Sequence, residues 1–147
     1  NNKKNYNELS DIEYISIDEK GNKYNILANS AISNKDDNNI LDLDNVRGKI
    51  TSPVRSTIFI VSDFGKYNSS NSNSSFYSNV VINFENKQIN CENFDIDMKK
   101  NIAVAYNNVI VTDPKSVMNA GKIVFDMATK DINITPGNKE KVNVVTN

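Results

Sequence analysis

The sequence has no histidine, no tryptophan and a single cysteine, Cys91, among its 147 residues. The lack of histidine excludes nearly every zinc, copper or haem site, and it excludes the Ser-His and Cys-His pairs that activate a nucleophile. One cysteine leaves no partner for an intramolecular disulfide. The sequence therefore predicts no catalytic residue, no metal site and no cofactor, and we expect a protein that is not an enzyme.

Neither charge sign dominates, and long apolar runs are missing. The 17 basic and 18 acidic residues give a net charge of −1, which argues against a nucleic-acid-binding surface. The sequence contains no run of about 18 apolar residues, so no segment of it is predicted to span a membrane. The length suits one domain or one elongated array of repeats, and a chain of this size needs no metal or disulfide to fold.

Short runs of alternating apolar and polar residues dominate the chain, which is the pattern of strands with one buried face. Turn-forming residues separate these runs. Asparagine, which favours turns, occurs 27 times in the chain. Segments with helical spacing are hard to find. The sequence predicts an all-β protein of roughly ten strands, with a sandwich, a jelly roll or stacked hairpins as the candidate architectures.

A repeat underlies the predicted strands. Small residues, each with an apolar residue two positions earlier, recur at intervals of 34, 29 and 29 residues: Ala28, Ser62, Cys91 and Ala120. Seventeen residues after each of the first three stands an Asn-Val pair: Asn45-Val46, Asn79-Val80 and Asn108-Val109. Each unit has the size of one β-hairpin with its connection.

The apolar pattern changes phase after the small residue of each unit. Apolar residues then fall at offsets of three and five, as at Phe94 and Ile96 after Cys91. Such a switch is what a β-bulge or a bend produces. We therefore expect bent hairpins that stack on one another, bury a continuous apolar interior and leave an open strand at each end.

Four segments resemble the LptC/LptA (OstA-like) family of lipopolysaccharide export proteins. Residues 18–31 are similar to the opening of LptC, with a turn, a glycine, an aromatic residue and a small-residue strand. Residues 61–68 resemble the family's "small-Asp-x-small-x-Tyr" element, and residues 44–48 and 78–82 resemble its "Asn-Val" element. The resemblance covers about Ile12 to Ile134, and the opening favours the LptC periplasmic domain over the soluble LptA bridge.

The resemblance implies a twisted β-jelly roll of stacked antiparallel bent hairpins over residues 12–147, preceded by a flexible segment, 1–11. It implies a periplasmic protein, anchored in the inner membrane through a segment upstream of Asn1. Such a protein accepts lipopolysaccharide from the membrane subunits of an ABC transporter. It passes the lipid to an LptA-type bridge protein through an edge strand, which we expect around Asp131 to Thr135 and Lys141 to Val145.

The acyl chains would contact the inward face of the strands. The predicted lipid-binding residues are Ile26, Leu43, Val46, Ile60, Tyr67, Tyr77, Val80, Ile82, Phe84, Phe94, Ile96, Val104, Tyr106, Val109, Met118, Ile123 and Phe125. Leu41, Ile89 and Val111 share this phase. The alternative for each residue is packing against its neighbours in an ordinary core.

Several polar residues admit two interpretations. Arg47, Lys49 and Arg55 would either meet lipid phosphates or keep an exposed edge soluble. Asp36-Asp37, with Asp42 and Asp44 beyond, would be either a calcium site or a solvated turn, and the spacing lacks the glycine and closing glutamate of an EF-hand. Asp95 and Asp97 fit an outward face better than a catalytic carboxylate pair, and Cys91 fits a small buried residue better than a reactive thiol.

Two functional classes remain open from the residues alone. The first is the lipid carrier, of the LptC or the LptA type. The second is a structural β-sandwich, such as a surface or adhesin-like module, with no ligand. A continuous apolar groove open at one end favours the carrier, whereas a fully packed core with covered edges favours the module.

Overall fold

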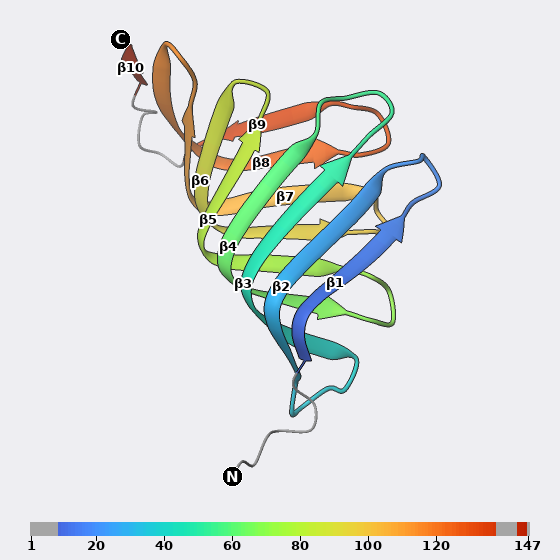
Figure 1. Ribbon diagram of the computed structural model, residues 1–147. Helices are drawn as coiled ribbons and strands as arrows, with labels where there is room; N and C mark the ends of the chain where they lie inside the picture. Colours follow the sequence, from blue (N-terminus) through green and yellow to red (C-terminus); the bar gives the residue numbers. More distant parts are fainter. Residues whose placement is uncertain (1–8, 138–143, 147) are drawn as a thin grey trace.

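The computed structural model describes residues 9–137 and 144–146, all of whose regular structure is β-strand. Ten strands follow one another along the chain (Figure 1): β1 Leu9–Ile17, β2 Lys23–Ser33, β3 Ile40–Thr51, β4 Ile58–Asn68, β5 Ser74–Phe84, β6 Lys87–Asp97, β7 Ile102–Thr112, β8 Ser116–Asp126, β9 Ile132–Pro136 and β10 Val144–Thr146. The first strand begins at Leu9, so it includes part of the segment expected to be flexible. Residues 1–8 of that segment lie outside the described residues.

Each strand pairs with the next in an antiparallel ladder, in the order β1-β2-β3-β4-β5-β6-β7-β8. The last two strands both pair with β8: β9 with its second half and β10 with its first half. The prediction of an all-β protein built from stacked antiparallel hairpins is confirmed.

The long strands bend near their middle, and in β3, β5 and β7 an asparagine with a left-handed backbone angle marks the bend. The φ angles of Asn45, Asn79 and Asn108 are 57°, 55° and 56°. Asparagine tolerates this region better than most residues because its short polar side chain bonds locally. These are the asparagines of the three Asn-Val pairs, so the repeat seen in the sequence encodes the bend.

The small residues of the repeat lie on the neighbouring strands at the same height. Val46 pairs with Ala28 on one side and Ser62 on the other, Val80 pairs with Cys91, and Val109 pairs with Ala120. Two of the small side chains also bond to the bent backbone. Ser62 Oγ donates to the carbonyl of Phe64 at 2.8 Å, and Cys91 Sγ donates to that of Asn93 at 3.3 Å.

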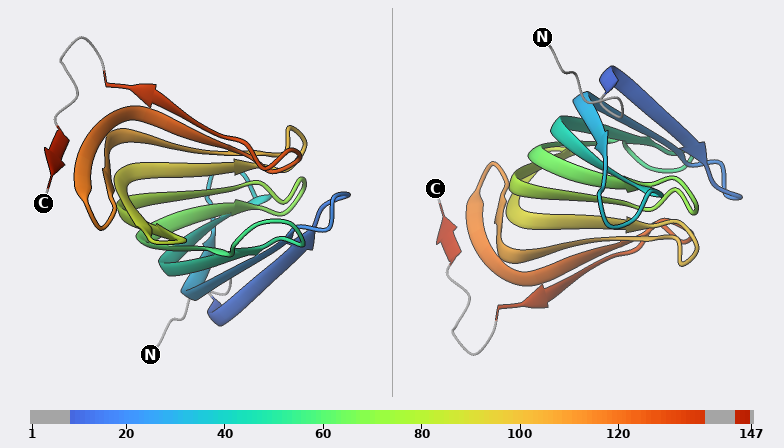
Figure 2. Two further views of the ribbon diagram at one scale, coloured as in Figure 1. Left: turned by 90° about the horizontal axis from the view of Figure 1, so that it is seen from above. Right: turned by 90° about the horizontal axis from the view of Figure 1, so that it is seen from below.

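The bends fold the sheet into two facing layers that are joined along one side, as Figure 2 shows from two directions. Layer A consists of residues 12–17, 23–28, 46–51, 58–61, 80–84, 87–91, 109–112, 116–120 and 144–146. Layer B consists of residues 9–10, 30–33, 40–44, 64–68, 74–77, 93–97, 102–106, 122–126 and 132–136. The turns gather along the opposite side, where two side chains bridge the layers. Asn22 Nδ2 donates to the carbonyl of Met127, and Arg55 Nη2 to that of Asp126, at 2.9 and 2.7 Å.

A chain of aromatic contacts runs through the space between the layers. The ring centroids of Phe76 and Phe94 lie 6.1 Å apart, those of Phe94 and Phe125 6.0 Å, and those of Phe125 and Phe84 5.7 Å. The last contact joins layer B to layer A. Ala103 and Ala105, both fully buried, face inward between the strands that carry Phe94 and Phe125, so large and small residues alternate across the interior.

Three of the seventeen residues expected to face inward, Tyr77, Val104 and Tyr106, instead lie on the outer surface. Their strand neighbours Phe76 and Ala105 are the buried ones. The expectation assumed that, at every bend, the inward-facing residues change from even to odd positions or the reverse. In β5 and β7 two consecutive residues have positive φ, Ser78-Asn79 and Asn107-Asn108, so the inward residues on either side are four apart and the phase is kept.

Candidate functional site

The end of the interior nearest β1 is closed by two stacked tyrosines. Tyr14 of layer A lies on Tyr67 of layer B, with ring centroids 4.3 Å apart and planes inclined by 14°. Tyr67 Oη shares a hydrogen bond of 3.2 Å with Ser72 Oγ, whereas the buried Tyr14 Oη has no partner among the described residues. Burial is the main reason that the pKa of Tyr14 is raised. The two stacked rings thus join the layers across the interior at this end.

The middle of the interior is also filled. Phe76 reaches from layer B to the backbone of Gly48 in layer A, where an added Cβ would lie 2.8 Å from the ring. Phe76, Phe94 and Ile60 are each no more than 1% exposed. The continuous apolar groove that would favour the carrier is therefore interrupted in this part of the molecule, because large side chains from both layers meet across it.

A hollow remains at the other end, where the sheet finishes. Its volume is about 260 Å³, and its walls come from both layers: Phe84, Ile89 and Val111 from layer A, and Ile123, Phe125, Ile132 and Ile134 from layer B, with Glu85 and Lys87 at the rim. The hollow forms because β8 is the last strand shared by both layers. Beyond it, β9 continues layer B and β10 continues layer A, apart from one another (Figure 2).

A second, more open hollow of about 650 Å³ adjoins the first and shares Phe84, Glu85 and Ile132 with it. Its other walls are Pro53, Val54, Arg55, Ser56 and Lys130. Three cationic side chains, Arg55, Lys87 and Lys130, line the two adjoining hollows together with the carboxylate of Glu85, and the carboxylates of Asp126 and Asp131 also act on Arg55. This arrangement suits an amphiphile with an apolar chain and an anionic head.

Arg55 has the clearest capacity for an anion. Its Nη2 donates to the Asp126 carbonyl, but its Nη1 is buried without a hydrogen-bond partner among the described residues. Desolvation lowers the pKa of the guanidinium, and the Asp126 carboxylate opposes that change. The group still stays charged because the unperturbed pKa of arginine lies so far above neutrality. The Arg55 side chain also lines the open hollow, where its positive charge would attract a lipid phosphate.

The fourteen predicted lipid-binding residues that do face inward divide into two groups. Phe84, Ile123 and Phe125 line the hollow. The remaining inward residues pack in the core or against it: Ile26, Leu43, Val46, Ile60, Tyr67, Val80, Ile82, Phe94, Ile96, Val109 and Met118. Sequence reasoning missed Ile132 and Ile134 as lining residues. Their alternation with Asn133 marked a strand, but it was assigned to a docking edge, not to a wall.

The basic residues expected to act together lie apart. Arg47 and Lys49 project from the outer surface of layer A, and only Arg55 lies at the rim. The contact of Arg55 with the end of β8 depends on the folding of the sheet, which the spacing of these residues does not reveal.

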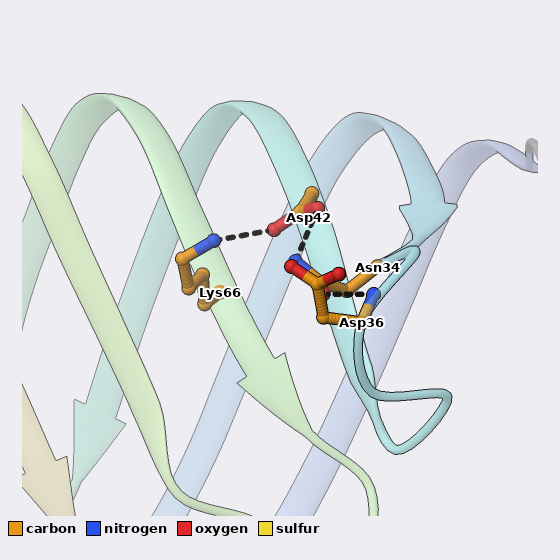
Figure 3. A network of polar contacts seen from close by, with 4 residues as sticks. All are labelled: Asn34, Asp36, Asp42 and Lys66. Carbon is orange, nitrogen blue, oxygen red and sulfur yellow. Dashed lines mark hydrogen bonds and ion pairs between the residues drawn. The ribbon is translucent and has the colours of Figure 1, made fainter.

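The acidic turn has no features of a calcium site. Figure 3 shows the contacts of Asp42: Lys66 Nζ lies 2.6 Å from its Oδ1, and Asn34 Nδ2 donates to its Oδ2 at 3.0 Å. Asn34 Oδ1 accepts in turn from the backbone of Asp36 at 2.8 Å. The hydrogen bond to Asp42 is the main reason that the pKa of Lys66 is raised. The described residues contain no group of three or more metal-ligating side chains.

The structure also agrees with Asp95 as an outward-facing residue and with Cys91 as a small buried one. Asp95 faces outward and accepts a 2.7 Å hydrogen bond from Tyr106 Oη, the main cause that raises the pKa of Tyr106 to about 12. Cys91 is buried, and desolvation raises the pKa of its thiol to about 11, so it is a packing residue and not a reactive thiol.

Comparison with known proteins identifies the family and the fold of the chain. The family model "Lipopolysaccharide-assembly, LptC-related" matches residues 2–141. The chain belongs to this family. Its architecture is similar to the crystal structure of LptH from Pseudomonas aeruginosa, the LptA-homologous periplasmic component of the lipopolysaccharide transport device. That similarity has a TM-score of 0.56 at 12% identity, over 83% of this chain and 93% of LptH. No curated protein matches the sequence.

The resemblance seen in the sequence is therefore confirmed, and membership of the LptC-related family makes the chain a periplasmic component of lipopolysaccharide transport and not an enzyme. The part of the chain that the structure describes holds no helix of the length and hydropathy that a membrane span requires.

Proposed function

We propose that this LptC-related chain binds the acyl chains of lipopolysaccharide in the hollow between β5, β6, β7, β8 and β9, with the lipid phosphates at the basic rim. The observation that carries the proposal is the contrast between the two ends of the interior. Tyr14 and Tyr67 close one end, while Phe84, Ile134 and their neighbours leave an apolar hollow at the other.

The size of the hollow limits what it holds at one time. A cavity of about 260 Å³ lies just below the usual range for a small-molecule site, so it accommodates part of a lipid and leaves the remainder in the adjoining open hollow. Each methylene group removed from water contributes about 0.8 kcal/mol, so four of them contribute roughly 3 kcal/mol. Binding of that strength favours capture and still permits release to a partner.

The free edge of β9 is the proposed route of transfer. β9 pairs with β8 on one side and has no neighbour on its other side among the described residues. An LptA-type bridge protein would add a strand there and extend the apolar wall that Ile132 and Ile134 begin. The expected docking region included residues 141–143, which lie outside the described residues.

The family resemblance supports two further parts of the proposal. The lipid arrives from the membrane subunits of an ABC transporter, and a segment upstream of Asn1 anchors the domain in the inner membrane. Among the described residues, β1 is the edge strand at the end of the sheet opposite β9 and β10, which leaves room for these contacts away from the hollow.

Site-specific photo-crosslinking tests the site. A photoreactive residue at Ile134, 45% exposed in the wall of the hollow, should capture lipopolysaccharide. The matched control is Ile110, which is 39% exposed but lies on the outer surface of layer A. Capture at Ile134 and not at Ile110 supports the proposal. Equal capture at both positions, or none at Ile134, overturns it.

The transfer route has a separate test. A photoreactive residue at Asn133 on β9 should capture the bridge protein, whereas one at Asn83, in the middle of the outer surface of layer A, should not. Capture from Asn83 alone would show that the partner docks on the sheet surface and not at its edge.

A further inference from the structure

The outer surface of layer A combines exposed apolar side chains with basic ones, on the side of the sheet nearest β1. In one cross-strand row Leu27, Arg47 and Val61 are neighbours on β2, β3 and β4. In the next row Lys49 lies beside Phe59. We call this surface the basic face and define it by Ile15, Leu27, Arg47, Lys49, Phe59 and Val61, all exposed.

These side chains form one continuous patch. Leu27, Arg47, Lys49 and Phe59 border a shallow depression of about 230 Å³ on the outside of the sheet, together with one acid, Glu13, which pairs with Leu27 across β1 and β2. Exposed apolar residues are ordinary when they are scattered singly, but a contiguous patch on a soluble domain marks a surface that contacts something.

The basic groups of this face are available to an external anion. Arg47 Nη2 donates to the neutral side chain of Asn29 at 2.9 Å. Glu13, the nearby acid, accepts from Asn25 Nδ2 and not from a basic group. Within residues 9–137 and 144–146 the one ion pair is Lys66–Asp42, which lies on layer B.

The outer surface of layer B carries mainly the opposite charge. Four aspartates project from it, Asp42, Asp44, Asp95 and Asp97, against Lys66 and Lys122. The net charge of −1 therefore hides a molecule with one basic, partly apolar face and one acidic face. A surface that recognises the basic face must be negatively charged, extended and able to accept apolar side chains.

We propose that the basic face docks on an anionic phospholipid bilayer. Lipid phosphates would meet Arg47 and Lys49, while Phe59 and Leu27 enter the headgroup region, as in other proteins that lie on a membrane surface. The acidic face then points away from the bilayer, which fixes the orientation of the domain. This contact is separate from the hollow, because it uses the outer surface of layer A and no residue of the hollow.

Vesicle co-sedimentation tests the proposal with lipids that contain no lipopolysaccharide. The chain should bind vesicles of phosphatidylethanolamine and phosphatidylglycerol more tightly than vesicles of phosphatidylcholine, and rising salt should weaken that binding. Lys49→Ala should weaken it about fivefold, since one base near an anionic surface contributes about that factor. Phe59→Ser should weaken it by about five- to tenfold.

The acidic face supplies matched controls. Phe64 is 43% exposed on layer B, against 51% for Phe59 on layer A, and both lie on β4. Phe64→Ser and Lys122→Ala should leave vesicle binding unchanged. The proposal is overturned if these controls weaken binding as much as Phe59→Ser and Lys49→Ala do, or if the chain ignores phosphatidylglycerol at low salt. Since Lys49 is exposed, its variant stays informative even if Phe59→Ser unfolds the domain.

Because the basic face and the hollow share no residue, the two proposals fail separately. Loss of lipopolysaccharide capture at Ile134 with intact vesicle binding rejects only the hollow. If the wild-type chain captures lipopolysaccharide at Ile134 but does not bind the vesicles, only the membrane contact is rejected.

Discussion

The ring of Phe76 occupies the space into which any side chain on Gly48 would project. A Cβ built on Gly48 would lie 2.8 Å from Cζ of Phe76 and 3.2 Å from Cδ1 of Ile60. The glycine of layer A and the phenylalanine of layer B are thus a matched pair across the interior. Their contact helps to fill the centre of the interior, whereas the hollow lies at the end where β9 begins.

Gly48→Ala should lower the free energy of unfolding by about 1–3 kcal/mol, the usual cost of overpacking a core. Urea denaturation followed by circular dichroism measures this change. Phe76→Leu in the same chain should recover part of the loss, because the smaller side chain makes room for the new methyl group. Gly137→Ala is the control, since an added Cβ at Gly137 meets nothing within 4 Å. Equal effects at both glycines would contradict the contact.

The bends make a second prediction. Asn108 has a φ of 56°, a conformation that costs an ordinary L-residue about 1–2 kcal/mol. Asn108→Val should therefore reduce stability by about that amount, whereas Asn108→Gly should cost little. Asn119→Val is the control, because Asn119 lies in β8 with ordinary strand angles, where valine is favourable. If both valine variants behave alike in urea denaturation, left-handed geometry is not what the asparagine supplies.

The all-β class, the order of the hairpins and the position of the bends could be predicted from the sequence because these features depend on local patterns. The alternation set the buried faces, and the Asn-Val pairs marked left-handed residues. The same patterns failed at Tyr77, Val104 and Tyr106, where the choice depended on whether a bend contained one or two left-handed residues. Large residues looked like better core candidates than Ala103 and Ala105, yet small ones are needed beside Phe94 and Phe125.

The candidate site was predicted less completely, because it depends on contacts between distant segments. Phe84 and Phe125 are 41 positions apart in the sequence and meet only when the layers fold together. Neither the closure of one end by Tyr14 and Tyr67 nor the separation of β9 from β10 has a local signature. Sequence patterns therefore identified the apolar interior, but not which part of it stays open.

The stacked tyrosines should respond differently to loss of their hydroxyl groups. Tyr14 Oη is buried without a hydrogen-bond partner among the described residues, so Tyr14→Phe removes an uncompensated polar group and should be neutral or stabilising by about 1 kcal/mol. Tyr67 Oη bonds to Ser72 Oγ, so Tyr67→Phe should destabilise by about 1 kcal/mol. Thermal and urea denaturation of the two variants would show the difference. A larger loss for Tyr14→Phe than for Tyr67→Phe would contradict the assignment of hydrogen bonds at the closed end.

Arg55 gives the sharpest functional prediction at the rim of the hollow. Its guanidinium lines the open hollow and should bond to a lipid phosphate there, and a hydrogen bond to a charged group contributes about 1.5–3 kcal/mol. Arg55→Ala should therefore weaken binding of phosphorylated lipopolysaccharide about tenfold or more, measured by fluorescence titration. The variant also loses the hydrogen bond to the Asp126 carbonyl, so a fall in stability alone would be ambiguous.

Dephosphorylated lipopolysaccharide separates these two roles of Arg55. If Arg55 binds phosphate, wild type and Arg55→Ala should bind the dephosphorylated lipid with similar affinity, because neither then has a phosphate contact to lose. If Arg55 only holds the end of β8 in place, both lipids should lose affinity by the same factor. Lys122→Ala should leave both affinities unchanged, since the exposed Lys122 side chain lies on the outer surface of layer B, on the opposite face from its neighbour Ile123 in the wall of the hollow.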